Sequence, residues 1–291
     1  MIRKEAVAGQ FYAGNLKSLK QQIITCFTGK WGPTTLPASK KHGKIYGIAA
    51  PHAGYEFSGG CAAWAYKALA EANHGDLFII LGVNHQGIGN KMSFSFDDFQ
   101  TPLGIIKNNN SFASAIIKKM RSEGIDADQN ENAHENEHSI EVQLPFLLFV
   151  SPDSTFVPIL LSSCSYDECK KLGEAIASFS ENFNKNICII ASGDFTHFGP
   201  EYGFVPFAKD IKNNLYRLDR KAIDKITCLD SKGFYEEAKK TNICGRDTIT
   251  TAIEACKALG SKKAEWLRYY TSGDVLDDYI NAVGYASFAF R

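Results

Sequence analysis

Residues 44–60, KIYGIAAPHAGYEFSGG, decide the fold of this chain. The stretch begins with apolar residues typical of a buried strand, and Pro51 then ends regular ladder hydrogen bonding because its ring fixes φ. His52 follows at once, and the residues after Ser58 have the apolar spacing of a helix, which Ser58 is placed to cap. We therefore expect a buried strand, a sharp turn that carries a histidine, and a helix. Ligands of open α/β sheets bind beyond the carboxyl ends of the strands, so His52 is placed for chemistry.

Two further apolar runs end in the same way. Residues 76–82 (DLFIILG) lead into His85, and residues 186–191 (NICIIA) lead into SGDFTHFG, which supplies Asp194 and His197. Each histidine by itself could be a structural residue. Their repeated position after apolar strands predicts that they share one crevice at the edge of the sheet.

Strand-like and helical patterns alternate along the rest of the chain. The alternation favours a single α/β domain over residues 1–291, with one doubly wound mixed sheet flanked by helices. The segment 91–107 alternates apolar and polar residues, which predicts an antiparallel hairpin or an edge pair.

The composition is that of an ordinary globular protein. The 291 residues contain 32 basic and 32 acidic side chains, so the net charge is zero and nothing indicates nucleic acid or an acidic membrane as a partner. No apolar run approaches the roughly 20 residues that span a bilayer. The N-terminus lacks the apolar region of a secretory signal, and the eight cysteines form no CxxC pair. We therefore expect reduced thiols and a cytoplasmic location.

The grouped histidines raise the question of a metal site. Two or three imidazoles with one anionic ligand make a catalytic site that keeps an open position. One candidate for the anionic ligand is Cys244 in TNICGRDT, just before the predicted helix 247–259. A helix N-terminus lowers the pKa of a thiol and favours the thiolate that binds metals. The alternative is that Cys244 is a buried cysteine that packs as a small apolar residue.

A second candidate site is the sequence HENEH, which begins at His134 and ends at His138. It matches H-E-x-x-H, which on a helix puts two imidazoles on one face with a glutamate as the base for zinc hydrolysis. The residues before it are too polar for the buried helix that such a site needs, and the apolar helix begins only after Ser139. A chance match is therefore favoured, with His138 and Glu141 as partners that could support the main site.

Read together, several motifs resemble those of one known family. AAPHAGYEFSGGCAAWAY, LGVNHQG, TPLG, EHSIEVQLPF, PILL, SGDFTHFG and NICGR occur here in the order and at the spacing of the Memo family, also called AmmeMemoRadiSam system protein B. The resemblance covers nearly the whole chain. It implies the fold of the class III extradiol dioxygenase catalytic subunit, whose members open catechol rings with non-haem iron held by two histidines and one glutamate.

The resemblance also implies roles for individual residues. His52 and His85 match the two histidine ligands, and Cys244 stands where the family's third metal-binding residue lies, in place of the dioxygenase glutamate. Asp194 and His197 match other pocket residues, with His197 similar to the acid–base histidine of the dioxygenases. A thiolate is a softer ligand than a carboxylate, so we expect iron or copper, with zinc as an alternative, and ring cleavage is in doubt.

Three functions follow as hypotheses. The first is a metal-dependent oxidoreductase of extradiol-dioxygenase ancestry that uses iron or copper on a small molecule. The second is a non-catalytic module that binds a small molecule or peptide in the same crevice. The third is a zinc hydrolase that uses His134 and His138. The family resemblance further implies protein partners, including a radical-SAM protein.

Overall fold

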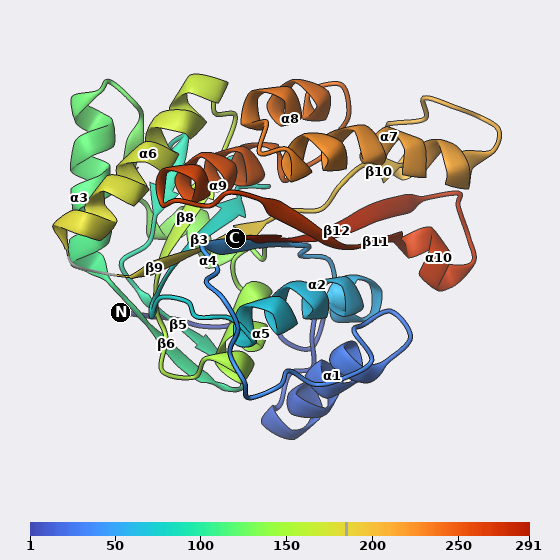
Figure 1. Cartoon of the computed structure of the whole chain (residues 1–291), viewed down its shortest axis with the longest axis horizontal. Coiled ribbons are helices and arrows are strands. Elements are labelled where there is room, and N and C mark those ends of the chain that lie inside the picture. The colour runs from blue at the N-terminus through green and yellow to red at the C-terminus, as the bar shows by residue number, and fades with distance from the viewer. Residues whose placement is uncertain (184–185) are drawn as a thin grey trace.

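The computed structural model describes residues 1–183 and 186–291, and its layers are shown in Figure 1. Within these residues the strands form one 12-stranded sheet. Its centre is four adjacent parallel strands, in the spatial order β8 (Thr155–Leu161), β3 (Leu77–Val83), β9 (Ile187–Ser192) and β2 (Gly47–Ala50). Their residues are almost all buried, which explains their unbroken apolar sequences, because both faces of a parallel sheet are covered.

Further strands extend both sides of this centre, and those on the β2 side pair antiparallel. On the β2 side lies β12 (Ala282–Phe290), which also pairs with β11 (Ala264–Thr271) and β10 (His197–Phe198). On the β8 side lie the shorter strands β6 (Gly104–Asn108), β5 (Asp98–Thr101), β1 (Ile2–Arg3), β4 (Met92–Phe94) and β7 (Ala127–Gln129). The pairing on this side is mixed, because β6 is parallel to β8 and β4 is antiparallel to it. β5 and β6 are an antiparallel pair, as the alternation in residues 91–107 predicts.

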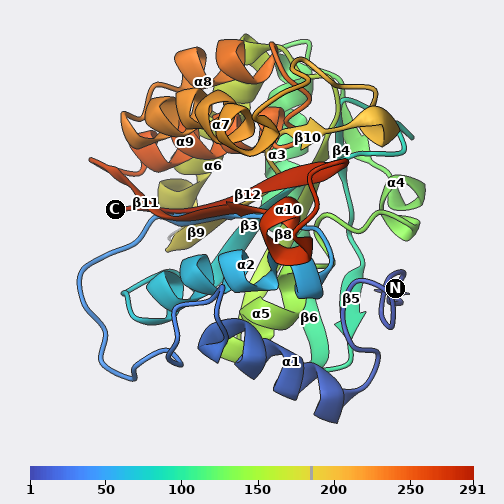
Figure 2. The same cartoon turned by 90° about the vertical axis from the view of Figure 1, so that its right-hand side faces the viewer.

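Helices cover both faces of the sheet, which confirms the doubly wound α/β architecture (Figures 1 and 2). One face carries α1 (Leu16–Thr28), α2 (Tyr55–Ala70) and α5 (Gln143–Val150). The other carries α3 (Asn110–Ser122), α6 (Tyr166–Asn182), α7 (Ile211–Thr227), α8 (Ser231–Ala238) and α9 (Arg246–Ala258). Two short helices, α4 (Glu131–Glu135) and α10 (Ser272–Leu276), complete the described chain. Among the described residues, no helix combines the length and the apolar character that crossing a membrane requires.

The start of α2 differs from the sequence prediction. The helix begins at Tyr55, so Ser58 lies inside its first turn, where its hydroxyl donates to the carbonyl of Ala53 (2.8 Å) and does not cap the helix. The following glycine, Gly59, serves packing, because a Cβ there would lie 2.5 Å from the Cys26 sulfur of α1. The early start leaves a very short turn between β2 and α2, and this turn holds His52 close to the strand end.

Candidate metal centre

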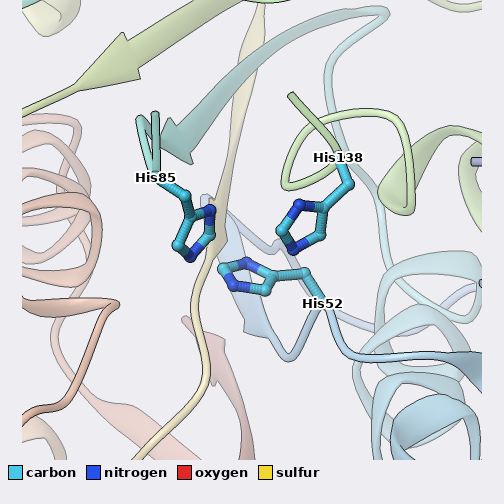
Figure 3. Close-up of side chains that lie close together, drawn as sticks. All are labelled: His52, His85 and His138. Carbon is cyan, nitrogen blue, oxygen red and sulfur yellow. The ribbon is translucent and has the colours of Figure 1, made fainter. Parts of the chain in front are cut away.

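Three histidines from separate segments meet at the carboxyl edge of the central strands (Figure 3). His52 follows β2, His85 follows β3, and His138 comes from the loop between α4 and α5. One ring nitrogen of each lies within 4.8 Å of the others. Two nitrogen ligands of one ion can be up to about 4.2 Å apart, so a small closure of the rings brings all three into range. The predicted convergence of His52 and His85 is therefore present, and His138 completes the group.

The hydrogen bonds of His52 fix which of its nitrogens faces the other rings. Its Nδ1 lies 3.0 Å from the hydroxyl of Ser192. That hydroxyl donates its only proton to the carbonyl of Ser139 (2.6 Å) and accepts from Nε2 of Gln143 (2.8 Å). Because the hydroxyl has no second proton to give, Nδ1 of His52 must carry the hydrogen. Nε2 then carries a lone pair, which is the arrangement that a metal ligand needs, and the Cys244 sulfur is 3.4 Å from it.

Glu137 supports the rings of the other two histidines, His85 and His138, as Ser192 supports that of His52. Its Oε1 accepts from Nδ1 of His85 (3.0 Å) and lies 3.3 Å from Nδ1 of His138. The backbone N–H groups of His85, His138 and Ser139 also donate to this carboxylate. Burial by itself would raise the pKa of Glu137, but the hydrogen bond from His85, together with the neighbouring ring of His138 and the backbone N–H of Ser139, outweighs it and lowers the pKa to about 2. A buried carboxylate behind the ring is the usual support of a metal-binding histidine.

The environment of His52 and His138 keeps these two imidazoles neutral, the form that binds metals. Burial is the main cause of a pKa well below the usual range for His52, and neighbouring His138 and His85 lower it further. Burial also lowers the pKa of His138 to about 4. A metal ion therefore does not have to displace protons from these two rings near neutral pH. The donor set, the neutral state of His52 and His138 and the orientation of His52 all fit a first-row metal ion, for which imidazole is a suitable ligand.

The three histidines line a cleft of 570 Å³, in which His52 is buried and His85 is exposed. Asp194 and His197 line the same cleft. Oδ1 of Asp194 accepts from the backbone N–H of His52 (2.8 Å), and burial raises the pKa of Asp194 to about 7. Burial lowers the pKa of His197 to about 4, and its backbone N–H and carbonyl are both bound by the side chain of Asn242.

Cys244 lies next to this group but not inside it. Its sulfur is 3.4 Å from Nε2 of His52 and accepts from the backbone N–H of Asp194 (3.2 Å). Burial, and next the carboxylate of Asp194, raise the pKa of Cys244 well above its usual value. The expectation that the start of α9 makes it a thiolate is therefore wrong for the metal-free protein, because burial outweighs the helix terminus. Its role as a metal ligand stays a prediction.

The HENEH sequence does not form the two-histidine helix face of a zinc hydrolase. Helix α4 ends at Glu135, so His134 is helical while His138 lies beyond the helix end. The two rings serve different purposes, because Nε2 of His134 is 2.9 Å from the carbonyl of Ser93 and His138 faces His52 and His85. The polar residues before the motif, which form only one short helix, are the physical reason.

Sequence reasoning missed the full role of His138 and Glu137. His138 was expected only as a supporting residue, and it is a member of the three-histidine group. The sequence signal that could have indicated this role is a glutamate next to a histidine, Glu137 and His138, shortly before the apolar helix α5. Glu141, the other expected supporting residue, does not reach the site, and instead binds Arg3 (2.7 Å).

A substitution at Glu137 tests its supporting role. Glu137→Gln keeps the size of the side chain but removes the charge that orients and polarises His85 and His138. We expect metal affinity to fall by about 10–100-fold, the range measured for residues that support metal ligands. Titration of Fe(II) and Cu(II) into both proteins measures it, with circular dichroism as the control for folding. Equal affinities would show that Glu137 only holds the loop.

Comparisons with known proteins show the family of this chain. A family model described as Memo-like protein matches residues 3–289. The chain belongs to the Memo family. A MEMO1 family protein of Methanopyrus kandleri is 40% identical over 296 residues, covering 100% of this chain and 99% of that protein. Another, of Methanothermobacter thermautotrophicus, is 37% identical over 289 residues, covering 98% and 99%.

A solved structure supports the fold alone. The crystal structure of an uncharacterized protein of Escherichia coli K12 superposes with a TM-score of 0.54 at 10% identity. The match covers 85% of this Memo-family chain and 100% of the other.

Proposed function

We propose that this Memo-family protein is a metal-dependent oxidoreductase that acts on a small molecule, with one iron or copper ion held by His52, His85 and His138. The observation that carries the proposal is the meeting of three imidazoles in the wall of an open cleft. Three protein ligands leave positions free for a substrate atom. When bound, such an ion can transfer electrons and polarises the atom that it binds. Zinc would polarise the bound atom but transfer no electrons.

Two residues of the chain, Asp194 and His197, would donate and accept protons beside the ion. Asp194, with a pKa raised by burial to about 7, can hold or release a proton at neutral pH, as general acid–base catalysis requires. The neutral ring of His197 faces the same cleft, and its Nδ1 has no hydrogen-bond partner among the described residues. We therefore assign acid–base roles to Asp194 and His197.

Metal analysis of untagged protein is the deciding experiment. Iron or copper near one ion per chain, together with turnover of oxidant or reductant, would support the oxidoreductase. Stoichiometric zinc without redox turnover would favour hydrolysis at the same site, and absence of metal affinity would favour the binding module. His197→Ala should retain the metal and lose turnover, since acid–base help contributes about 10²–10⁴-fold. The predicted radical-SAM partner is a separate proposal, to be tested by co-purification.

Cys244 is the alternative to His138 as the third metal ligand. Because its thiol must first lose a proton from a position where its pKa is high, we expect Cys244→Ala to lower metal affinity less than tenfold at pH 7. Calorimetric titration with a competing chelator measures it, and Cys228→Ala, at an exposed cysteine, is the matched control. A loss of 100-fold or more, growing as the pH rises, would instead identify the thiolate as a ligand and restore the assignment made from the sequence.

A further inference from the structure

We propose that Phe11 is a positioning residue of the metal centre, whose ring packs against His138 and holds that imidazole toward the ion. The inference rests on the proposed function, because it concerns the same group of three histidines. It gives the segment of residues 7–12 a role in a site from which this segment lies far in the sequence.

His138 has weaker polar support than its neighbour His85. The ring of His85 donates to Oε1 of Glu137 (3.0 Å), whereas Nδ1 of His138 lies 3.3 Å from that oxygen. The same oxygen also accepts from the backbone N–H groups of His138 and Ser139, both at 2.9 Å. Because a carboxylate oxygen has about two lone pairs, these donors already exceed what it can accept at full strength. Hydrogen bonding to Glu137 therefore orients the ring of His138 only weakly.

Packing against Phe11 supplies a second restraint on this ring. The centroids of the Phe11 and His138 rings are 4.7 Å apart, at an interplanar angle of 42°, which is a normal contact between aromatic rings. The ring of His85 stacks on His138 at the same centroid distance and at 16°. A turn of the His138 ring would lose both contacts, so its two neighbours hold it in place. Phe11 is half-buried and lines the cleft together with the three histidines.

Phe11 is itself held firmly beside the loop that carries His138. Its backbone N–H donates to the carbonyl of Val7 (2.9 Å), and its carbonyl accepts from the first N–H of α2 (2.8 Å). The N–H of Val7 (3.0 Å) and the hydroxyl of Tyr12 (2.7 Å) both donate to Oε1 of Glu141, which lies in the same loop as His138. The segment with Phe11 and the loop with His138 are therefore fastened to each other.

The orientation of His138 matters because a metal ion tolerates little displacement of its ligands. One ring nitrogen of each histidine lies within 4.8 Å of the others. Nitrogen ligands bind at about 2.0–2.1 Å, so the three rings must point at one place. Without the ring of Phe11, His138 is free to turn away, and the ion then keeps two imidazoles for part of the time.

Phe11→Ala tests this role through the binding of Cu(II). We expect the affinity, measured by titration against a chelator, to fall by about tenfold, the low end of the range for residues that support metal ligands. Electron paramagnetic resonance detects the nitrogen ligands of bound Cu(II), and part of the ions in the variant should show two imidazoles in place of three. Phe11→Leu keeps the apolar bulk, so its affinity should stay within about threefold of that of the unsubstituted protein.

Phe149→Ala is the matched control. It removes another half-buried phenyl ring, at the end of α5, which stacks on Phe27 with centroids 5.9 Å apart and does not line the cleft. A general loss of stability, followed by urea denaturation, should appear in both alanine variants. The change in affinity and in the Cu(II) spectrum should appear only in Phe11→Ala.

The metal-free protein separates this inference from the proposed function. In that form, ¹³C relaxation of labelled histidine should show a more mobile His138 ring in Phe11→Ala than in the unsubstituted protein. Unchanged Cu(II) binding in Phe11→Ala, equal changes in Phe149→Ala, or no recovery in Phe11→Leu would overturn the proposal. If the unsubstituted protein binds no metal, the oxidoreductase is refuted, and a His138 ring that stays equally ordered without Phe11 would refute this inference as well.

Discussion

His138→Ala is expected to lower the affinity of the protein for Fe(II) or Cu(II) by at least about 100-fold. Removal of a residue that only supports a ligand costs up to about 100-fold, so loss of the ligand itself should exceed that. The ring of His138 lies 4.7 Å from that of His85 and 5.3 Å from that of His52, centroid to centroid. With His138 gone, two histidines remain, and the ion loses one of its three imidazoles. Titration against a chelator of known affinity measures the change.

The matched control is His134→Gln, at the other end of the HENEH sequence. The amide of glutamine can still donate to the Ser93 carbonyl that His134 now contacts, so the fold should survive. Metal affinity is expected to stay within about threefold, because His134 is not in the three-histidine group. Retention of metal in His138→Ala would contradict the three-histidine site, whereas loss of metal in both His134→Gln and His138→Ala would revive the zinc-hydrolase hypothesis.

Glu141→Ala is expected to lower the free energy of unfolding by about 3–5 kcal/mol, the cost of removing one partner from a buried ion pair. Glu141 is fully buried and accepts from the guanidinium of Arg3 (2.7 Å) and the hydroxyl of Tyr12 (2.7 Å). The backbone N–H groups of Ala6 and Val7 also donate to it. The substitution would leave the Arg3 charge and all of these donors without their partner. Urea denaturation measures the loss.

Glu141→Gln is the control for this prediction. It keeps the shape and one carbonyl acceptor but removes the charge, so it should destabilise the protein less than the alanine variant. Arg3 also donates to the carbonyls of His134 and Glu137, so the pair fastens the N-terminal segment to the loop that carries His138. If Glu141→Ala costs less than about 1 kcal/mol, the segment is held mainly by other contacts.

The strands and the main helices could be predicted from the sequence because each depends on a pattern of apolar residues within its own segment. Residues 76–82 and 186–191 are unbroken apolar runs, and they form β3 and β9, which are buried on both faces. The prediction of helix starts was less accurate. Ser58 is a good capping residue by type, yet α2 begins three residues earlier, because the tight turn after Pro51 and the packing of Gly59 on α1 decide where the helix can start.

The sequence by itself determined that His52, His85, Asp194 and His197 follow strand ends, and parallel strands in one sheet bring such ends to one edge. Only the tertiary structure decided that His138 joins them, because its position depends on a loop held by Glu137 and by the buried pair of Arg3 and Glu141. It also decided the protonation of Cys244. A pKa depends on burial and on neighbours distant in sequence, such as Asp194, and no local pattern records either.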